Sequence, residues 1–334
     1  PVVLMVGETF FILDLATGII PDSPTLYTVN SAFVGITFIL FVVTAVYDLV
    51  LTTSSKVPFD QERRKFVKII FDVTMIIAAM SYLLRGLAQG AKAPVLNNVY
   101  VKVKDFPLNG FTIVQLTDIH IGNTIKRDFV EDLVSRTNAL APELVVITGD
   151  LVDLPIDRIS HDLEPLKELT APTYFILGNH DNFNDPETVI AHVRTLGIQP
   201  LLNDCVSIGE GDRRFNLVGI NDLSGERMGL FPHDLRRAFA RADATRPSIV
   251  RAHQAKTSGL VDDYRCDLMI SGHTHGGQIF PFGYLVMIDQ PYLSGLHQHS
   301  VDKQIFVSNG TGFWGPPLRV LAPSEISRIV ITPA

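Results

Sequence analysis

The chain has very few cysteines. Only Cys205 and Cys266 occur among its 334 residues, and neither belongs to a Cys-x-x-Cys pair. A metal site built on such a pair is therefore excluded, because those sites need two thiolates at close spacing. We predict that both thiols are buried, with a single disulfide as the alternative if this part of the chain lies outside the cytoplasm.

Positive charge is also in short supply. The chain has 28 Lys and Arg against 35 Asp and Glu, which gives a formal net charge of -7, and no stretch forms a basic stripe. This balance argues against binding of nucleic acid through its phosphate backbone. Residues 1–94 hold seven basic and seven acidic residues, so the whole acidic excess lies in residues 95–334. An acidic surface disfavours phosphate substrates unless bound divalent cations invert the local charge.

Charged residues are scarcest before residue 95. Three apolar runs there predict membrane helices over residues 2–20, 31–51 and 66–87. The middle run has one charge, Asp48, and about 20 apolar residues are enough to cross a bilayer. Buried helices of a soluble bundle are the alternative for the first and third runs. A signal peptide fits poorly, because no basic segment precedes the first run.

The loops between these runs predict an orientation. The loop 52–66 carries Lys56, Arg63, Arg64 and Lys65, whereas the loop 21–30 has no basic residue. By the positive-inside rule, the loop 52–66 is cytoplasmic and the third helix leads away from the cytoplasm. We therefore expect an integral protein of a bacterial inner membrane with an extracytoplasmic C-terminal domain.

Three acidic residues lie within the apolar runs. Glu8, Asp14 and Asp72 are costly in lipid and should face other helices or water. We favour pairing with Lys68 or Arg85 between helices over a polar pathway or a contact with a substrate headgroup.

The rest of the chain has the pattern of an α/β domain. Residues 88–98 predict a linker, because small residues and Pro94 interrupt the helical pattern. In residues 99–334, strand-like and helix-like segments alternate, which favours an α/β fold. The predicted strands are 99–103, 112–116, 144–148, 173–177, 215–220, 248–250, 268–271, 305–307 and 326–331, and the predicted helices are 126–140, 158–169, 186–196 and 232–241.

Five short motifs each follow a predicted strand in this domain. In an open α/β sheet, ligands bind at the carboxyl edge of the strands, so side chains at five such ends should converge. The motifs are Asp118-Ile119-His120, Gly149-Asp150-Leu151-Val152-Asp153, Gly178-Asn179-His180-Asp181, His253, and Gly272-His273-Thr274-His275-Gly276-Gly277.

The residue types in these motifs point to metal chemistry. Asp118 with His120, and His273 with His275, are i, i+2 pairs that can offer two side chains to one place in an extended or turning segment. Carboxylate and imidazole together suit Mn, Fe, Zn or Ni better than Ca or Mg. A two-metal hydrolase needs a carboxylate that bridges ions roughly 3.5–4 Å apart, so that a shared hydroxide attacks phosphorus in line. Asp150 is the candidate bridge.

Taken together, the motifs DxH, GDxxD, GNHD, H and GHTHGG resemble those of the calcineurin-like metallophosphoesterase family, over roughly residues 108–334. The longer stretch GHTHGGQIFPFG and the N-terminal apolar runs resemble its membrane-anchored, transmembrane subgroup. The resemblance implies a two-sheet α/β sandwich flanked by helices. It also implies hydrolysis of a phosphomonoester or phosphodiester with two divalent metal ions, Mn first and Fe, Zn or Ni as alternatives.

The resemblance carries over residue by residue. It implies two groups of metal ligands and one bridge: Asp118, His120 and His275; Asn179, His253 and His273; and Asp150 between them. His180 would stabilise or protonate the leaving oxygen, Asp181 would orient His180, and Asp153 would support the ligands without binding metal. Relatives usually have an apolar residue at the position of Arg251, where this chain departs from the pattern.

The substrate is less determined by the sequence. Residues 283–296 and the stretch Phe313-Trp314 are unusually apolar, which fits a lid or core packing, or else an acyl-chain groove or a surface on the bilayer. With the membrane helices, this favours a lipid-linked phosphate or pyrophosphate, with a UDP-diacylglucosamine-type pyrophosphate as one form. The alternatives to a phosphoesterase are a noncatalytic membrane scaffold or sensor on the same fold, and a transporter.

Overall fold

The computed structural model describes residues 2–17, 23–54 and 61–334. The chain divides into two compact units. The first comprises Pro1–Lys92 and Gly315–Leu321, and the second comprises Ala93–Trp314 and Ala322–Ala334.

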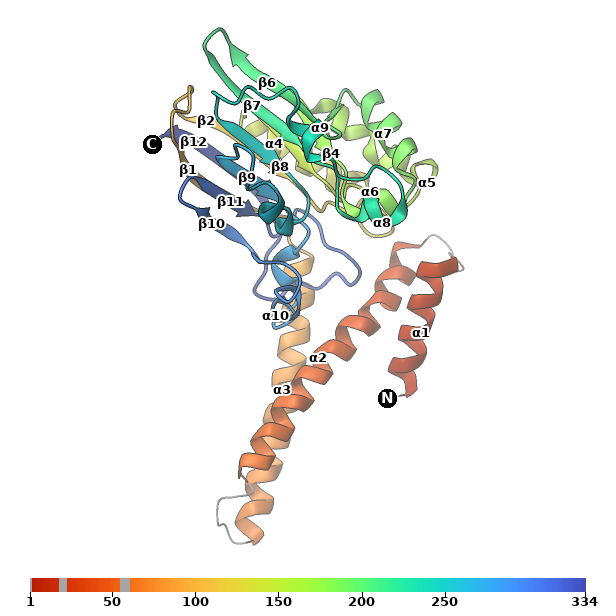
Figure 1. Ribbon diagram of the computed structural model, residues 1–334. Helices are drawn as coiled ribbons and strands as arrows, with labels where there is room; N and C mark the ends of the chain where they lie inside the picture. Colours follow the sequence, from red (N-terminus) through yellow and green to blue (C-terminus); the bar gives the residue numbers. More distant parts are fainter. Residues whose placement is uncertain (1, 18–22, 55–60) are drawn as a thin grey trace. The chain divides into compact units, whose positions relative to one another are not determined.

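Three helices make up most of the first unit: α1 (Val2–Thr17), α2 (Pro24–Ser54) and α3 (Gln61–Gly90) (Figure 1). At 31 and 30 residues, α2 and α3 are each about 45 Å long and apolar enough to cross a membrane. The 16 residues of α1 span only about 24 Å, less than a hydrocarbon core of about 30 Å. Residues 18–20 of the predicted first run lie outside the described residues.

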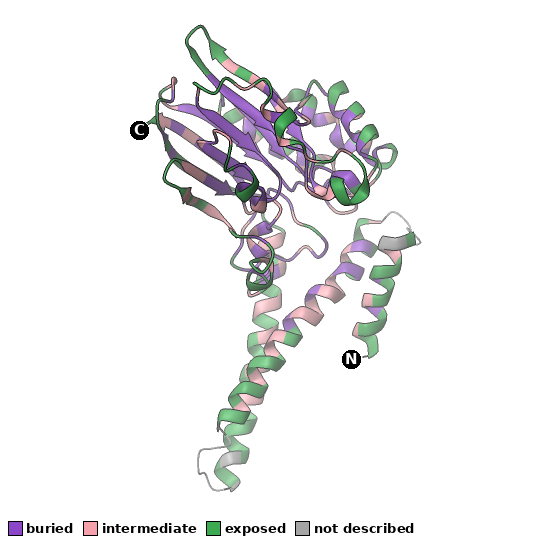
Figure 2. Ribbon diagram, viewed as in Figure 1, coloured by how far each residue is buried: buried purple, intermediate pink, exposed green. Residues whose placement is uncertain are grey.

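Most apolar side chains of α3 are exposed, and those of α2 are mostly exposed or half-buried (Figure 2). Ile69, Ile76 and Ile77 on α3, for example, each expose more than half of their surface. A helix of a soluble bundle would bury such residues, so the exposure favours lipid as their surroundings.

Polar contacts between α2 and α3 are centred on Asp72. Its carboxylate accepts a hydrogen bond from the Tyr47 hydroxyl at 2.7 Å and pairs with Lys68 Nζ at 2.9 Å. The Tyr47 and Phe71 rings stack with centroids 5.2 Å apart. Asp72 therefore pairs with Lys68 as predicted, but within α3 and not between helices; the contact between helices is the hydrogen bond from Tyr47 on α2.

The second unit contains two mixed sheets of six strands each (Figure 1). The first sheet has the order β1 (Val95–Val103), β12 (Glu325–Pro333), β2 (Phe111–Leu116), β3 (Leu144–Thr148), β4 (Thr173–Ile176) and β5 (Gln199–Pro200). The second has the order β10 (Gly295–Ser300), β11 (Lys303–Val307), β9 (Leu268–Ser271), β8 (Ser248–Arg251), β7 (Arg213–Gly219) and β6 (Asp204–Glu210). The run from β2 to β5 is parallel, and so is the run from β11 to β7.

Alternation of side chains along the strands separates three apolar cores. In β3, Leu144 and Val146 face the second sheet, while Val145 and Ile147 face helices. The helices on that outer side are α4 (Arg127–Ala139), α5 (Ile156–Leu163), η1 (Glu164–Glu168) and α7 (Pro186–Thr195). The outer side of the second sheet is covered by α9 (Leu235–Phe239) and η2 (Ala255–Leu260). The predicted two-sheet α/β sandwich flanked by helices is thus confirmed.

Several predicted boundaries differ from the structure. The predicted linker 88–98 is shorter, because α3 continues to Gly90 and β1 begins at Val95. The predicted helix 158–169 is α5 followed by η1, with Pro165 at the change. The edge strands β6 and β10 were not predicted, because their exposed residues give no continuous apolar run. Cys205 and Cys266 are buried and free, as predicted.

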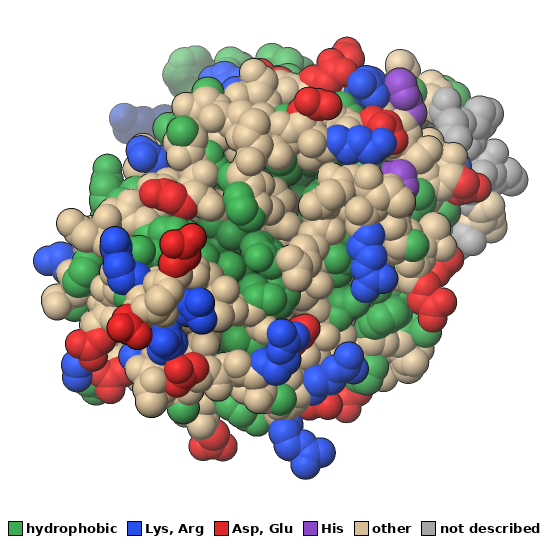
Figure 3. Space-filling view, turned by 90° about the horizontal axis from the view of Figure 1, so that it is seen from above, with side chains coloured by type: hydrophobic (Ala, Val, Ile, Leu, Met, Phe, Trp, Pro, Cys, Tyr) green, Lys and Arg blue, Asp and Glu red, His purple; other side chains and the backbone are tan. Residues whose placement is uncertain are grey.

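Arg251 at the end of β8 is buried between the sheets. Charged side chains at the surface are mixed in sign and solvated (Figure 3), whereas Arg251 is 0% exposed. None of the described residues accepts a hydrogen bond from its Nε, Nη1 or Nη2, and its nearest aromatic partner is the Tyr174 ring at 5.9 Å. Burial lowers the pKa of Arg251 to about 9. The resemblance noted from the sequence implies an apolar residue at this position.

Replacing Arg251 with methionine is expected to stabilise the domain. A buried charge without a hydrogen-bonding partner is destabilising, and apolar replacement of buried charged groups can raise the free energy of unfolding by about 1–4 kcal/mol. Thermal unfolding of Arg251→Met and Arg251→Lys, each beside wild type, tests this. Lysine keeps the charge and should give no gain, and a lower Tm for Arg251→Met would contradict the prediction.

Candidate metal centre

Strand ends from both sheets meet at one edge of the second unit. In the first sheet β2, β3 and β4 are parallel neighbours, and in the second β8 and β9 are. The predicted site residues follow these strands: Asp118 and His120 after β2, Asp150 after β3, Asn179 and His180 after β4 on α6 (Asn179–Phe183), His253 after β8, and His273 and His275 after β9. The structure brings the carboxylates and imidazoles among them together in three overlapping groups, and Asn179 contacts one of these through His253.

Hydrogen bonds between the sheets fix this edge. Gln115 Nε2 on β2 donates to the Ser271 carbonyl oxygen at the end of β9, over 2.9 Å. The His273 backbone N–H donates to Asp118 Oδ1 at 2.9 Å. His253 Nδ1 lies 2.9 Å from the Thr148 carbonyl oxygen at the end of β3. Each sheet therefore positions site residues that belong to the other.

Asp118, His120 and His275 form the first group, in which all three ligand atoms lie within 4.8 Å of one another. His275 Nε2 is 3.5 Å from Asp118 Oδ1 and 3.0 Å from His120 Nε2. The other ring nitrogen of His120, Nδ1, is 2.6 Å from Asp153 Oδ1. Because a carboxylate accepts, Nδ1 carries the proton and the lone pair on Nε2 faces the centre of the group.

Asp150, His253 and His273 form the second group. His253 Nε2 lies 3.2 Å from Asp150 Oδ2 and 3.2 Å from Asn179 Oδ1. The Thr148 carbonyl can only accept, so the neutral His253 ring carries its proton on Nδ1. Its Nε2 faces two oxygen acceptors, so a proton or a metal ion must lie between them. Burial alone would lower the pKa of His253, but the charge of Asp150 raises it well above its usual range, so without metal a proton occupies this place.

The donor set therefore fits divalent metal ions. Carboxylate, imidazole and amide oxygen are ligands of Mn, Fe, Zn and Ni, and a histidine whose other nitrogen is held by a carboxylate or carbonyl is the usual form of a metal-binding histidine. Asp150 belongs to the second group and also faces the first. Its Oδ2 is 3.2 Å from His253 Nε2 and 3.8 Å from His120 Nε2. Burial works to raise the pKa of Asp150, but the neighbouring histidines hold it well below its usual range.

His180 sits beside these groups with Asp153 as its partner. His180 Nδ1 is 2.9 Å from Asp153 Oδ1, the oxygen that also contacts His120. Burial alone would lower the pKa of His180, but the charge of Asp150 and the hydrogen bond to Asp153 outweigh it and raise the pKa to about 9. His180 is therefore protonated at neutral pH and has a second N–H, on Nε2, to donate.

Asp181 has other partners than those predicted. Its Oδ1 accepts from the backbone N–H of Leu151 at 2.9 Å and of Val152 at 3.2 Å, and its Oδ2 accepts from Gly178 N–H at 2.8 Å. Asp181 thus holds the backbone on both sides of Asp150 and does not orient the His180 ring. Asp153 makes the contact that the sequence assigned to Asp181.

The backbone at the site is unusual. Asp118, His120, Asp150, His273 and His275 all have positive φ, between 50° and 71°. Each such residue costs of order 1 kcal/mol or more, which is typical of functional sites. The i, i+2 pairs therefore converge through left-handed turns. Of the two conformations predicted from the sequence, extended and turning, the structure has the turning one.

Two glycines leave room for these carboxylates. A Cβ on Gly178 would overlap Asp150 Oδ1, and one on Gly272 would overlap Asp118 Oδ2. These two glycines are thus explained by the close approach of the carboxylates.

Some residues near the site were missed by sequence reasoning. Asp222, which follows β7, is buried and accepts from Gln254 Nε2 at 3.0 Å. Its charge acts on both His253 and His273. The apolar run 215–220 before Asp222 was the available signal, because it repeats the pattern of the five motifs.

Two aromatic rings border His180. The Trp314 and Phe183 ring centroids each lie 5.6 Å from that of His180, and both side chains are exposed. Gln278, which follows the last motif, fixes Trp314 by hydrogen bonds to its backbone at 2.8 and 3.1 Å. The predicted aromatic stretch at Trp314 therefore lies at the rim of the site.

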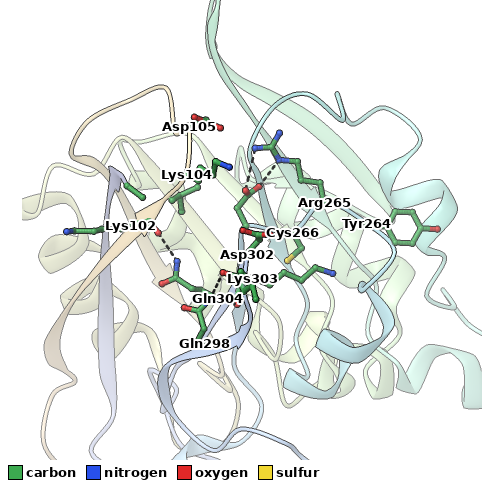
Figure 4. Close-up of a pocket in the computed structure, with 14 residues that line it drawn as sticks. Lys102, Lys104, Asp105, Tyr264, Arg265, Cys266, Gln298, Asp302, Lys303 and Gln304 are labelled. Atoms are coloured by element: carbon green, nitrogen blue, oxygen red, sulfur yellow. Dashed lines mark hydrogen bonds and ion pairs between the residues drawn. The ribbon is translucent and has the colours of Figure 1, made fainter.

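A separate cavity lies at the opposite edge of the sheets, where β1 ends and β9 and β11 begin (Figure 4). It has a volume of about 670 Å³ and is lined by side chains of both signs. Arg265 pairs with Asp267 at 3.1 Å, and Lys303 pairs with Asp262 at 3.2 Å. These pairs neutralise much of its charge, and its lining includes none of the metal-ligand groups described above.

Comparison with known proteins agrees with this geometry. Residues 111–277 match the family model of the calcineurin-like phosphoesterases. The chain is 35% identical to an "Uncharacterized metallophosphoesterase" of Helicobacter pylori (strain ATCC 700392 / 26695), over 99% of this chain and 88% of the other. It is 34% identical to a Danio rerio "Transmembrane protein with metallophosphoesterase domain", over 75% of this chain and 60% of the other. The chain belongs to the calcineurin-like phosphoesterase family.

Proposed function

We propose that this chain is a membrane-anchored phosphoesterase that uses two divalent metal ions to hydrolyse a phosphomonoester or phosphodiester. The observation that carries the proposal is the pair of imidazoles, of His120 and His253, whose Nε2 atoms both face the buried carboxylate of Asp150. A buried carboxylate that faces imidazole nitrogens requires positive charge close by, and metal ions would supply it. Membership of the calcineurin-like phosphoesterase family points to phosphoester hydrolysis as the reaction that would use these ions.

We assign the metal ligands as two groups joined by one residue. One ion would be held by Asp118, His120 and His275, the other by Asn179, His253 and His273, and both by Asp150. Bound ions of this type polarise a phosphoryl oxygen and make water a nucleophile at neutral pH. Mn is our first expectation for both positions, because nitrogen and oxygen ligands are mixed here.

The remaining groups move or position protons. His180, protonated and only partly buried beside the exposed rings of Trp314 and Phe183, would donate from Nε2 to the leaving oxygen. Asp153 would hold the rings of both His180 and His120 at Nδ1. Asp181 would keep the backbone around Asp150 in its left-handed turn through three hydrogen bonds.

Membrane attachment through α2 and α3 is part of the proposal. It is supported by the length of these helices, by their exposed apolar side chains, and by relatives named as transmembrane proteins. The basic residues of the loop 52–66 favour a cytoplasmic position for that loop and an extracytoplasmic position for the site. A bacterial inner membrane is the location that we expect. A lipid-linked phosphate or pyrophosphate is the substrate class that fits an anchored site with the aromatic rim of Trp314 and Phe183.

Metal content tests the ligand assignment. The detergent-purified protein, equilibrated with Mn, is expected to hold about two ions per chain. Asp150→Asn should hold fewer, because it removes charge shared by both groups. Elemental analysis after gel filtration measures this, with Asp302→Asn, a change of an exposed aspartate, as control. Full metal content in Asp150→Asn would refute the bridge. Because ligands stabilise the folded state, EDTA should lower the Tm of wild type more than that of Asp150→Asn.

Turnover tests the proposed reaction. Wild type with Mn should hydrolyse bis-p-nitrophenyl phosphate or p-nitrophenyl phosphate, and EDTA should abolish this. His180→Gln should lower kcat by about 10²–10⁴-fold with its metal content kept, because it removes a proton donor and no ligand. His161→Gln, at an exposed position of α5, is the control. Two bound ions without turnover of either ester would instead support a noncatalytic scaffold.

Gly178→Ala tests the close approach of backbone to Asp150. The added methyl group overlaps the carboxylate, so the affinity for Mn should fall by about 10–100-fold. Gly259→Ala is the matched control, since a Cβ there meets nothing within 4 Å. Titration against a chelating dye measures both affinities, and equal values would show that the loop adjusts without loss.

A further inference from the structure

The last metal-ligand motif is followed by a projecting apolar loop, residues 280–288, which includes α10 (Gly283–Val286). No charged residue occurs between Gly276 and Ile288. Six of the nine residues in the loop are large exposed hydrophobics: Phe280, Phe282, Tyr284, Leu285, Met287 and Ile288. Elsewhere in the described part of the second unit, such side chains occur singly or in close pairs along the chain.

The base of the apolar loop is firmly held. Gly277 and Gly283 pack so closely that a Cβ on Gly277 would overlap the Gly283 backbone. After the loop, Gln290 is buried and its Oε1 accepts from the Lys256 backbone N–H at 3.1 Å. Lys256 Nζ also pairs with Asp289 at 2.8 Å. The loop is therefore a fixed projection whose polar contacts lie at its base and whose apolar side chains face outward.

Such a surface is unfavourable in water. Contiguous exposed apolar side chains on a soluble domain mark contact with a partner or a membrane. Aromatic rings with aliphatic side chains, and no charge, are suited to the region between headgroups and acyl chains. A protein partner would normally also require polar groups at the rim of the contact.

The chain connection favours the membrane as the partner. Only residues 91–94 separate the end of α3 at Gly90 from the start of β1 at Val95. Four extended residues reach at most about 14 Å. If α3 crosses a bilayer, the domain that follows remains close to its surface, whatever the orientation of that domain.

We propose that the apolar loop inserts into the lipid bilayer, between headgroups and acyl chains, and so presents the metal centre to phosphate groups at the membrane surface. The inference rests on the membrane attachment proposed above. Because the loop begins five residues after His275, insertion would bring one wall of the site to headgroup depth. A lipid phosphate could then reach the site without leaving the bilayer.

Spin labels in proteoliposomes test the insertion. Ile288, which is 81% exposed, is changed to cysteine and labelled with a nitroxide. Val301→Cys, at a 92% exposed position between β10 and β11, is the aqueous reference, and Phe41→Cys, 69% exposed on α2, is the lipid reference. The native thiols should not react, because burial raises the pKa of Cys205 to about 11 and of Cys266 to about 12. Labelled wild type checks this.

The readout is collision of each nitroxide with oxygen, which concentrates in lipid, and with a water-soluble nickel chelate. The full chain is reconstituted in vesicles of phosphatidylcholine and phosphatidylglycerol. We expect the ratio of oxygen to nickel collisions at Ile288 to be severalfold higher than at Val301 and close to that at Phe41.

Two results would overturn the inference while the anchor stands. With Phe41 in lipid, a ratio at Ile288 equal to that at Val301 would place the loop in water. Protection of Ile288 from both reagents would mean that protein or a second copy of the chain covers it. A water-like ratio at Phe41 would instead show that the anchor proposal itself is wrong. Retained turnover of bis-p-nitrophenyl phosphate in all three variants confirms that the fold is intact.

Discussion

Burial of negative charge is the constraint on which this structure depends. Asp118, Asp150 and Asp181 are all buried where the two sheets meet. Removing carboxylates from water costs several kcal/mol each unless other groups compensate. For Asp181 the compensation comes from three backbone N–H groups. For Asp150 it comes from the backbone N–H of His180 and from the facing imidazoles. The centre still requires positive charge, which bound metal ions would supply. The stability of this edge of the domain and its proposed chemistry would then depend on the same ions.

The two sheets meet this constraint together. The ligands after β2 and β3 belong to the first sheet, and those after β8 and β9 belong to the second. Bonds such as His273 N–H to Asp118 Oδ1 cross from one sheet to the other. The site can therefore exist only when both sheets have formed and stacked in register. The left-handed turns at the ligands are maintained by this assembly, because local preference alone would disfavour them.

The sequence predicted most of what depends on strand ends. Each motif follows a strand, and parallel neighbours bring those ends together, so the convergence of Asp118 with Asp150 and of His253 with His273 followed from strand order. The stacking of the two sheets, which joins these pairs, did not follow from strand order. The partner of His180 did not follow, because Asp153 and Asp181 are both acidic and near in sequence, and only the path of the loop after β3 decides between them. Asp222 carried too weak a local signal. Strands β6 and β10 were missed because an exposed edge strand needs no apolar pattern.

The position of Trp314 has a consequence for spectroscopy. It is the only tryptophan in the chain, and its ring lies 5.6 Å from that of His180. The intrinsic fluorescence of the whole protein therefore originates, apart from tyrosine, from a single indole beside one imidazole of the site. Changes in its emission can follow events at His180 in real time, in the native protein and without an attached dye.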